Sequence, residues 1–237
     1  MALLLGKHIA IDFPIYGTNN RSLKHQFLKA ATGGVIANDA SKMVVVRALD
    51  DISFEFHEGD RVGLVGHNGS GKSTLLKVLA GIYEPSRGSF QVKGRITSML
   101  SLFLGMDMEA TGLENIKLRS CIMGVSAAGL KKIIQDVEDF SGVGEFLDLP
   151  MRTYSSGMLM RLAFTIATSV EADIILMDEW LSVGDSDFME KAKNRLEHFI
   201  NNARIVVLAS HDYDLIKKQC NKIIHLEHGR LISQEMP

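Results

Sequence analysis

The chain lacks the features that mark secreted and membrane-spanning proteins. Its 237 residues contain only two cysteines, Cys121 and Cys220, far apart and in apolar surroundings, so a disulfide-stabilised fold is not expected. Nowhere do about 18 apolar residues follow one another, the length that a membrane-spanning helix needs. The opening MALLLGK has neither a basic segment nor a cleavage site, so no signal peptide is predicted. If the protein works at a membrane, another chain must supply the span.

An excess of charge of either sign is also missing. The 26 Lys and Arg residues and the 28 Asp and Glu residues leave a net charge of −2, which indicates neither nucleic-acid binding nor strong attraction to a membrane surface. Apart from His211, the histidines show no ligand spacing with cysteine or acid, so no structural metal is predicted. What the chain does have is 46% hydrophobic residues, enough for one large domain or for a core with a subdomain.

Apolar residues alternate between strand and helix periods along the chain. Strands are expected at residues 7–16, 43–56, 61–66, 88–94, 172–179 and 204–211, with a terminal hairpin around His228 and Gly229. A helix is expected at 73–82 and a short one around 23–30. Residues from about 111 to 170 have helical character, including a stretch capped by Ser126. The pattern predicts an α/β core (1–97 and 171–237) with a mixed sheet and N-terminal antiparallel strands, interrupted by a helical subdomain at about 98–170.

The strongest motif is GHNGSGKS, which follows a strand and opens a helix. It matches the phosphate-binding pattern G-x-x-x-x-G-K-[ST] in the structural context that this pattern requires. Glycines let backbone N–H groups surround phosphate oxygens, while Lys72 reaches the β- and γ-phosphates and the Ser73 hydroxyl is a ligand for Mg²⁺. The residues expected to bind ATP here are Gly66, His67, Asn68, Gly69, Ser70, Gly71, Lys72, Ser73 and Thr74.

Two buried strands deliver further polar residues at their carboxyl ends, where ligands of open α/β sheets bind. The run ADIILMDE ends in Asp178 and Glu179, and VVLASH ends in His211. Asp178 suits the Mg²⁺ shell, and Glu179 can orient or deprotonate an attacking water. His211 at a strand end is expected to contact the γ-phosphate. Together with the phosphate loop, these residues predict a P-loop ATPase.

The stretch YSSGM marks a second place where an anion could bind. It precedes apolar residues at helical spacing, so Ser155 or Ser156 is a natural N-cap and Gly157 leaves the backbone open. Unpaired N–H groups and the helix dipole both attract anions to such an end. The alternative is an ordinary capped helix. The residues alone do not explain why one chain would carry two phosphate sites.

The motifs GHNGSGKST, YSSGM, ILMDE, LSVGD and ASHD occur in that order and together resemble the nucleotide-binding subunit of an ABC transporter, over roughly residues 43–232. YSSGM stands in the place of the LSGGQ signature, residues 181–185 in that of the D-loop, and His211 in that of the switch histidine. The resemblance implies a homodimer in which the signature of each copy, with Ser155, Ser156 and Gly157, caps the ATP held by its partner. It also places Asp185 near the nucleotide.

YSSGMLMRLAF, DEWLSVGDSDF and TGLENI are similar to ATP-binding subunits that export bacterial surface polysaccharides, first lipopolysaccharide O-antigen and next capsule or teichoic acid. This implies a separate permease, a lipid-linked polysaccharide substrate and a peripheral location on the cytoplasmic face of the bacterial inner membrane. Because the sequence ends at Pro237, just past the core, no C-terminal carbohydrate-binding domain is expected.

The sequence departs from the family pattern in the signature and in the Q-loop. Ser156 and Met158 replace a glycine and a glutamine of the signature, and residues 98–104 contain no Q-loop glutamine. Tyr16 is the candidate for stacking on adenine, although simple strand packing explains it equally well.

Two other readings compete with the exporter. A soluble ABC ATPase usually carries fused cassettes or long coiled coils, which this chain lacks. A P-loop GTPase or kinase would leave YSSGM unexplained, and NKII (residues 221–224) lacks the aspartate of a guanine-reading NKxD.

Overall fold

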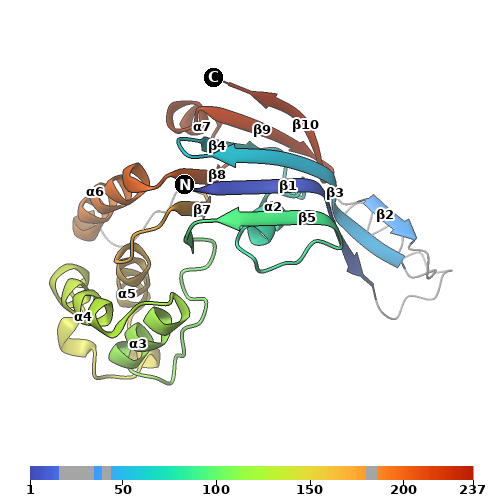
Figure 1. Cartoon of the computed structure of the whole chain (residues 1–237). Coiled ribbons are helices and arrows are strands. Elements are labelled where there is room, and N and C mark those ends of the chain that lie inside the picture. Colours follow the sequence, from blue (N-terminus) through green and yellow to red (C-terminus); the bar gives the residue numbers. More distant parts are fainter. Residues whose placement is uncertain (16–34, 39–43, 180–185, 237) are drawn as a thin grey trace. The chain divides into compact units, whose positions relative to one another are not determined.

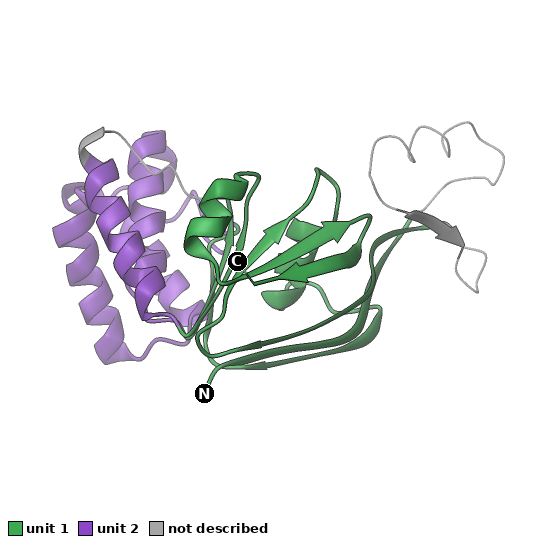
Figure 2. Cartoon of the chain, turned by 90° about the horizontal axis from the view of Figure 1, so that it is seen from above, with its two compact units in different colours: residues 1–100, 173–180, 204–237 green, residues 101–172, 181–203 purple. Residues whose placement is uncertain are grey.

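The computed structural model describes residues 1–15, 35–38, 44–179 and 186–236 (Figure 1). The expected short helix around residues 23–30, the candidate adenine residue Tyr16 and the D-loop with Asp185 lie outside these ranges. The chain divides into two compact units, residues 1–100, 173–180 and 204–237, and residues 101–172 and 181–203 (Figure 2). The sequence expectation had assigned all of 171–237 to the core, whereas 181–203 cluster with the helical residues.

The first unit begins with a four-stranded antiparallel sheet in the order β2-β3-β1-β5. Its strands are β1 (Leu3–Pro14), β2 (Val35–Asn38), β3 (Val44–His57) and β5 (Arg87–Lys93). In β3 the side chains of Ile52, Phe54 and Phe56 are buried while Ser53 and Glu55 between them are exposed, the period of two that a half-buried strand requires. This sheet confirms the expected N-terminal antiparallel strands.

A six-stranded mixed sheet in the order β10-β9-β4-β8-β7-β6 completes the first unit. Neighbours from β9 to β6 are parallel, and β10 pairs antiparallel with β9 as the expected hairpin. The strands are β4 (Arg61–Val65), β6 (Ile96–Ser98), β7 (Ile174–Asp178), β8 (Ile205–Ala209), β9 (Lys222–Glu227) and β10 (Arg230–Glu235). Every side chain of β8 is buried, as a strand covered on both faces requires.

The core of this unit forms around helix α2 (Lys72–Leu79), which follows β4. Its Leu75, Leu76 and Leu79 are at most 1% exposed and cluster with side chains of both sheets, including Leu49 and Leu176. Helix α7 (Tyr213–Gln219) follows β8 and is capped by Asp212, whose carboxylate accepts the Leu215 N–H at 3.0 Å. The two connections that enter these helices therefore start at the carboxyl ends of neighbouring parallel strands.

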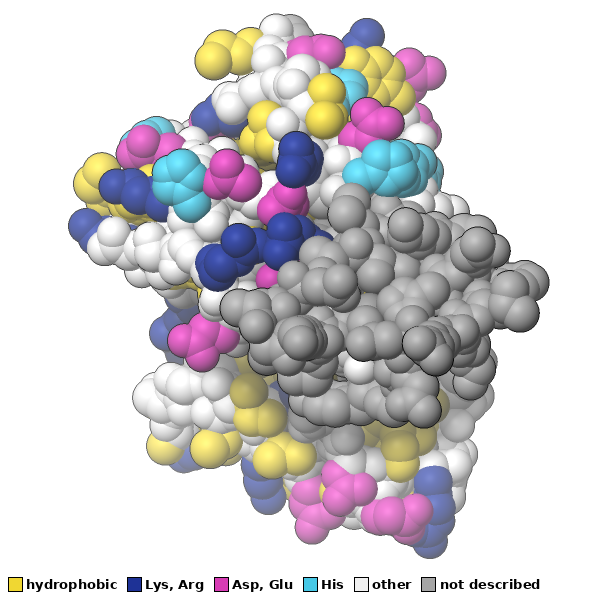
Figure 3. Space-filling model, turned by 90° about the vertical axis from the view of Figure 1, so that its right-hand side faces the viewer, with side chains coloured by type: hydrophobic (Ala, Val, Ile, Leu, Met, Phe, Trp, Pro, Cys, Tyr) yellow, Lys and Arg dark blue, Asp and Glu magenta, His cyan; other side chains and the backbone are white. Residues whose placement is uncertain are grey.

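Basic and acidic side chains stand side by side on one face of the molecule (Figure 3). Among such pairs, Asp50 of β3 accepts from Arg230 at 2.6 Å and from Arg47 at 3.4 Å, and Asp12 of β1 accepts from Arg47 at 2.8 Å. These ion pairs link β1, β3 and β10, because Asp12 lies in β1, Arg47 and Asp50 lie in β3, and Arg230 lies in β10. They connect the two inner strands of the antiparallel sheet to the terminal hairpin of the mixed sheet.

The second unit is helical and has a core of its own. It contains α3 (Gly112–Ile122), α4 (Ala127–Ser141), α5 (Ser156–Thr168) and α6 (Ser186–Asn202), with short 3-10 turns at Gly144–Phe146 and Met151–Thr153. Ser126 caps α4, as expected, by accepting the Gly129 N–H at 3.2 Å. Among the described helices none is both long and apolar enough to cross a membrane.

A polar cluster ties three of these helices together. The guanidinium of Arg195 in α6 donates to the Asp136 carboxylate of α4 at 2.8 Å and to the Thr168 hydroxyl of α5 at 2.6 Å. The Ser169 hydroxyl donates to the same carboxylate at 2.6 Å, and Arg195 stacks over the Phe140 ring. Burial by itself would raise the pKa of Asp136, but the hydrogen bonds from Arg195 and Ser169 outweigh it and hold the pKa below its usual value.

Asp136→Asn should therefore destabilise the protein in a pH-dependent way. Breaking a buried ion pair costs about 3–5 kcal/mol, and the partial exposure of Asp136 reduces this to about 1–3 kcal/mol at pH 7. A depressed pKa adds stability above the ordinary aspartate pKa of about 3.9, and this stability is lost as the pH falls through the folded-state pKa. Urea unfolding at pH 7 and near pH 3.5 should show the deficit shrinking in acid.

The matched control is Asp139→Asn, an exposed aspartate on the same helix, which should change stability by less than about 0.5 kcal/mol at either pH. A deficit for Asp136→Asn that is the same at both pH values would contradict a stabilising charge at this position.

Candidate active site

The loop between β4 and α2 can form only with glycine at two positions. Gly66 has φ 152°, and a Cβ there would lie 2.2 Å from the Leu226 carbonyl oxygen of β9. Gly71 has φ 109° and would place a Cβ 2.9 Å from Leu49 in the facing sheet. Both conformations strain any other residue. The loop is therefore held in a fixed shape against β9 and β3.

Lys72 closes this loop from within. Its ammonium donates to the carbonyl oxygens of Gly66 at 2.7 Å and His67 at 3.1 Å. Burial lowers the pKa of Lys72, and the charges of Asp178 and Glu179 oppose that shift. When a phosphate binds, its oxygens can replace these two carbonyl oxygens as acceptors for the ammonium. The side chain therefore already lies where an anion would enter.

The first turn of α2 completes the cradle. Its N-cap, Gly71, has no side-chain hydrogen bond, and the first N–H groups of a helix, here including Thr74, lack intrahelical acceptors. Such an end attracts phosphate. Ser70 has a structural position instead, because its side chain is fully buried, its N–H donates to His67 and its carbonyl accepts from Gly229.

A hydroxyl and a carboxylate from separate elements meet beside Lys72. The Ser73 hydroxyl donates to Asp178 Oδ2 at 2.7 Å. Two neighbouring oxygens in an octahedral Mg²⁺ shell lie about 3 Å apart, given a metal–oxygen distance of about 2.1 Å. The pair therefore has the donor type and the spacing that Mg²⁺ requires, with the remaining positions left to water and phosphate.

Glu179 is fixed at the end of β7 in a rare backbone conformation. It has φ 66° although it is not glycine, and strain of this kind is concentrated at functional sites. Its two carboxylate oxygens accept from the Ser210 hydroxyl at 3.0 Å and from the His211 N–H at 3.1 Å, while His211 Nε2 lies 3.7 Å away. Half of the Glu179 side chain is exposed, so water can reach a carboxylate whose direction is set.

These residues surround one pocket of about 210 Å³. Its lining combines Val46 and Ala48 of β3 with residues 68–74, Asp178 and His211. The fold thus brings together the loop and the two strand ends that the sequence singled out. Val46, Ala48 and the Ser210 hydroxyl were missed. Ser210 could have been suspected from its position directly before His211, whereas no sequence signal distinguishes Val46 or Ala48 from other strand residues.

The YSSGM stretch begins helix α5 in the helical unit. Of the two expected candidates, Ser155 is the N-cap, and its hydroxyl accepts the Met158 N–H at 3.2 Å. A hydroxyl that accepts one bond still has its own proton to donate. Ser156 is exposed, and the nearest atom to a Cβ at Gly157 would be 3.9 Å away. Tyr154 anchors the turn by donating to the Phe146 carbonyl at 2.6 Å. This helix start is open to an incoming group.

Comparisons with known proteins agree with this arrangement. The family model described as ABC transporter matches residues 49–182. The O-antigen export system ATP-binding protein RfbE of Yersinia enterocolitica is 46% identical over 236 residues, which cover 100% of this chain and 99% of that protein. The teichoic acids export ATP-binding protein TagH of Listeria innocua is 34% identical over 225 residues, 95% of this chain and 64% of that protein.

A solved structure supports the fold. The dimeric ATP-binding cassette MJ0796 bound to ADP and Pi superimposes with a TM-score of 0.68 at 20% identity, covering 98% of both chains. The phosphate loop, the Ser73–Asp178 pair and the held Glu179 occur within that fold, in a chain related to RfbE over its whole length. The chain belongs to the ABC transporter family.

Proposed function

We propose that the chain is the ATP-hydrolysing subunit of an ABC transporter that exports a lipid-linked surface polysaccharide of the O-antigen type. The observation that carries the catalytic part is the Ser73–Asp178 pair in one pocket, with Glu179 held beside it by the N–H of the lining residue His211. Support for the substrate class comes from RfbE, the ATP-binding protein of an O-antigen export system, which this chain matches over 99% of its length. Teichoic acid export is the second candidate, because TagH is related at 34% identity.

ATP binding begins with an exchange of partners at Lys72. Its ammonium leaves the Gly66 and His67 carbonyls for the β- and γ-phosphate oxygens, while the loop N–H groups and the first turn of α2 supply further donors. Val46 and Ala48 form the β3 side of the pocket. Tyr16 stacks on the adenine ring, which is our proposal for the base.

Ser73 and Asp178 are the residues that would hold Mg²⁺. Their oxygens are 2.7 Å apart, close to the spacing of neighbouring ligands in its shell. When bound, Mg²⁺ neutralises charge on the β- and γ-phosphate oxygens. The protein's part is to keep the serine hydroxyl and the aspartate carboxylate beside Lys72, so that phosphates and ligands meet in one place.

Glu179 acts as the general base in the reaction of ATP and water to ADP and phosphate. Ser210 and the His211 N–H hold its carboxylate in position, so it can accept a proton from a water aimed at the γ-phosphate. The His211 imidazole contacts the γ-phosphate itself and reports whether it is present. The two side chains are close enough to respond together, because His211 Nε2 lies 3.7 Å from Glu179.

A second copy of the chain completes each site. Ser155, Ser156 and Gly157 then cap the γ-phosphate held by the partner's loop, and Asp185 lies near the same nucleotide. The exposed, capped start of α5 supports this role, because its N–H groups can bind an anion without a lysine. The dimeric structure of the cassette MJ0796 supports the same assembly. ATP would hold two copies together, and hydrolysis would release them.

An apolar patch on the helical unit supports docking to a membrane permease. Leu104 and Gly105 lie against α3, since the Leu104 carbonyl accepts from Arg119 and a Cβ at Gly105 would be 2.7 Å from Ile122. The side chains around them are 40–64% exposed, namely Phe103, Leu104, Met108, Leu118 and Ile122. Exposed apolar patches mark interaction sites, and this one takes in the segment that lacks a Q-loop glutamine. The protein would then lie on the cytoplasmic face of the bacterial inner membrane.

Glu179→Gln should keep ATP binding and lose turnover, because the amide retains the shape but cannot accept the proton. Loss of a positioned base lowers the rate by about 10²–10⁴-fold. Phosphate release and nucleotide binding measure the two effects, and size-exclusion chromatography with ATP should show a persistent dimer. Glu171→Gln, an exposed glutamate before β7, is the control and should leave the rate unchanged. Turnover of Glu179→Gln within about twofold of wild type would remove Glu179 from this role.

Membrane association tests the export assignment. Expressed alone, the protein should stay out of the membrane fraction, and co-expression with its permease should bring it there. Leu118→Glu with Ile122→Glu should abolish this association while leaving the ATPase site intact, because a charge in an apolar contact cannot be desolvated cheaply. Ile82→Glu, at an exposed apolar residue of the first unit, should have no effect. Equal association with and without the permease would contradict the docking model.

A further inference from the structure

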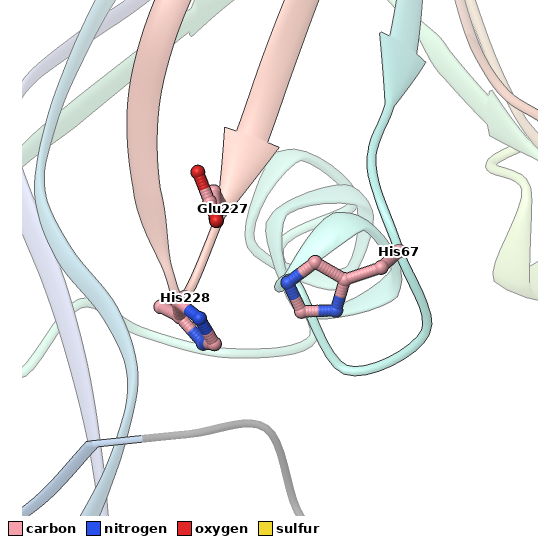
Figure 4. Close-up of side chains that lie close together, drawn as sticks. All are labelled: His67, Glu227 and His228. Atoms are coloured by element: carbon pink, nitrogen blue, oxygen red, sulfur yellow. The ribbon is translucent and has the colours of Figure 1, made fainter.

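Three potential metal ligands lie together beside the phosphate loop (Figure 4). His67 comes from the loop, and Glu227 and His228 come from the turn between β9 and β10. Their ligand atoms all lie within 4.8 Å of one another, and the two imidazole rings are 5.0 Å apart. All three side chains are exposed. Among the residues that the structure describes, this is the one group of three such ligands.

Backbone hydrogen bonds hold the β9–β10 turn, which carries Glu227 and His228, against the loop that carries His67. The Gly229 N–H donates to the Ser70 carbonyl at 2.9 Å, and the Gly229 carbonyl accepts the Asp50 N–H at 2.8 Å. The turn is thereby pressed against the loop, where Gly66 approaches the Leu226 carbonyl so closely that a Cβ would lie 2.2 Å from it. His228 takes the left-handed conformation that the tight turn requires, with φ 47°. The site is therefore built on two rigid segments.

The hydrogen bond of His67 determines which of its two ring nitrogens can bind a metal. Its Nδ1 lies 2.7 Å from the Asn68 carbonyl oxygen. Because a carbonyl oxygen only accepts, Nδ1 carries the proton, and Nε2 of the neutral ring keeps its lone pair. Histidine ligands of metals characteristically donate their second ring N–H to a backbone carbonyl in this way. His67 thus has the tautomer of a ligand.

We propose that His67, Glu227 and His228 form a binding site for a borderline divalent transition metal, with Zn²⁺ as the type. Two imidazoles and one carboxylate with a fourth position for water are a common Zn²⁺ ligand set. Bound ligands would stand about 3.4 Å apart, so the side chains must rotate inward by about 1 Å, which their exposure permits. The proposal does not depend on the proposed transport function.

This site differs in chemistry from the Mg²⁺ pair. Ser73 and Asp178 offer oxygen alone, which suits Mg²⁺, whereas imidazole nitrogen favours Zn²⁺ and related metals. Mg²⁺ would therefore prefer the Ser73–Asp178 pair and Zn²⁺ the histidine site, although both sites border the same loop. Linear spacing indicated no metal site, because His67 and His228 approach each other only through the parallel pairing of β4 with β9.

The test is a Zn²⁺ titration of the full chain against a chromogenic chelator, with excess Mg²⁺ to occupy the oxygen site. Both cysteines can be set aside as ligands. A Cys121→Ser background removes the exposed thiol, and Cys220 is buried, out of reach of a metal ion from solution. Burial also raises the pKa of the Cys220 thiol to about 12, which disfavours the thiolate that would bind metal. We expect one equivalent bound, and Co²⁺ in its place should give visible bands without a thiolate charge-transfer band.

Two variants remove ligands outside the nucleotide pocket. His228→Asn keeps the backbone, because asparagine tolerates the left-handed conformation, and Glu227→Gln keeps the side-chain shape. Each should weaken Zn²⁺ binding by at least about tenfold and leave ATP hydrolysis unchanged. His57→Asn is the matched control, since His57 is exposed and lies 3.3 Å from the single carboxylate of Glu55.

The assignment would be overturned if His228→Asn and Glu227→Gln both bound Zn²⁺ as tightly as the wild type. It would also be overturned if the wild type bound no equivalent of Zn²⁺. A loss of ATP hydrolysis in Glu179→Gln with Zn²⁺ binding intact would leave this site standing. The reverse pattern, hydrolysis without Zn²⁺ binding, would remove the site and leave the proposed function untouched.

Discussion

The parallel pairing of β8 with both of its neighbours is the constraint on which the site depends. Ala209, the last residue of β8, stands in register with Leu64 of β4 and with Asp178 of β7. Its carbonyl also accepts the Glu179 N–H at 2.8 Å, and the next N–H, that of Ser210, donates to Leu64. This register brings the ends of three strands to the same edge of the sheet. The phosphate loop, the acidic pair Asp178 and Glu179, and Ser210 all lie at or directly after these strand ends. A shift of one residue in β8 would separate them.

This register is secured by burial rather than by the polar groups that it presents. The side chains of β7 and β8 that face the core are at most 5% exposed, and each buried aliphatic side chain contributes about 1.5–3 kcal/mol. Such strands can hold Glu179 at φ 66°, a conformation that costs about 1–3 kcal/mol. From this backbone position the Glu179 carboxylate meets the Ser210 hydroxyl and the His211 N–H, and these two hydrogen bonds fix its direction. A rigid sheet therefore prepares the polar groups before nucleotide arrives.

Local sequence patterns predicted what lies within one element or one turn. The buried strand ending at Asp178 and the Ser155 cap both follow from residues close in sequence. The patterns could not predict contacts made by distant segments. That α6 clusters with the helical residues depends on Arg195 meeting Asp136, and the approach of His67 to His228 depends on sheet order. Lys72 turning onto loop carbonyls depends on the loop shape itself.

The central claim is that the signature of one copy completes the phosphate site of another. It can be tested with Lys72→Ala, which empties the loop, and Gly157→Asp, which puts a carboxylate where phosphate approaches. The nearest atom to a Cβ at Gly157 is 3.9 Å away, so aspartate fits without a clash, and its charge repels phosphate.

Two mixed dimers give opposite outcomes, read as tightly trapped nucleotide. With both changes on one copy and a wild-type partner, each composite site has one damaged half, and no trapping is predicted. With one change on each copy, one site collects both lesions and the other stays intact, so trapping is predicted. Trapping confined to the first dimer would contradict the account, because YSSGM would then serve the loop of its own chain.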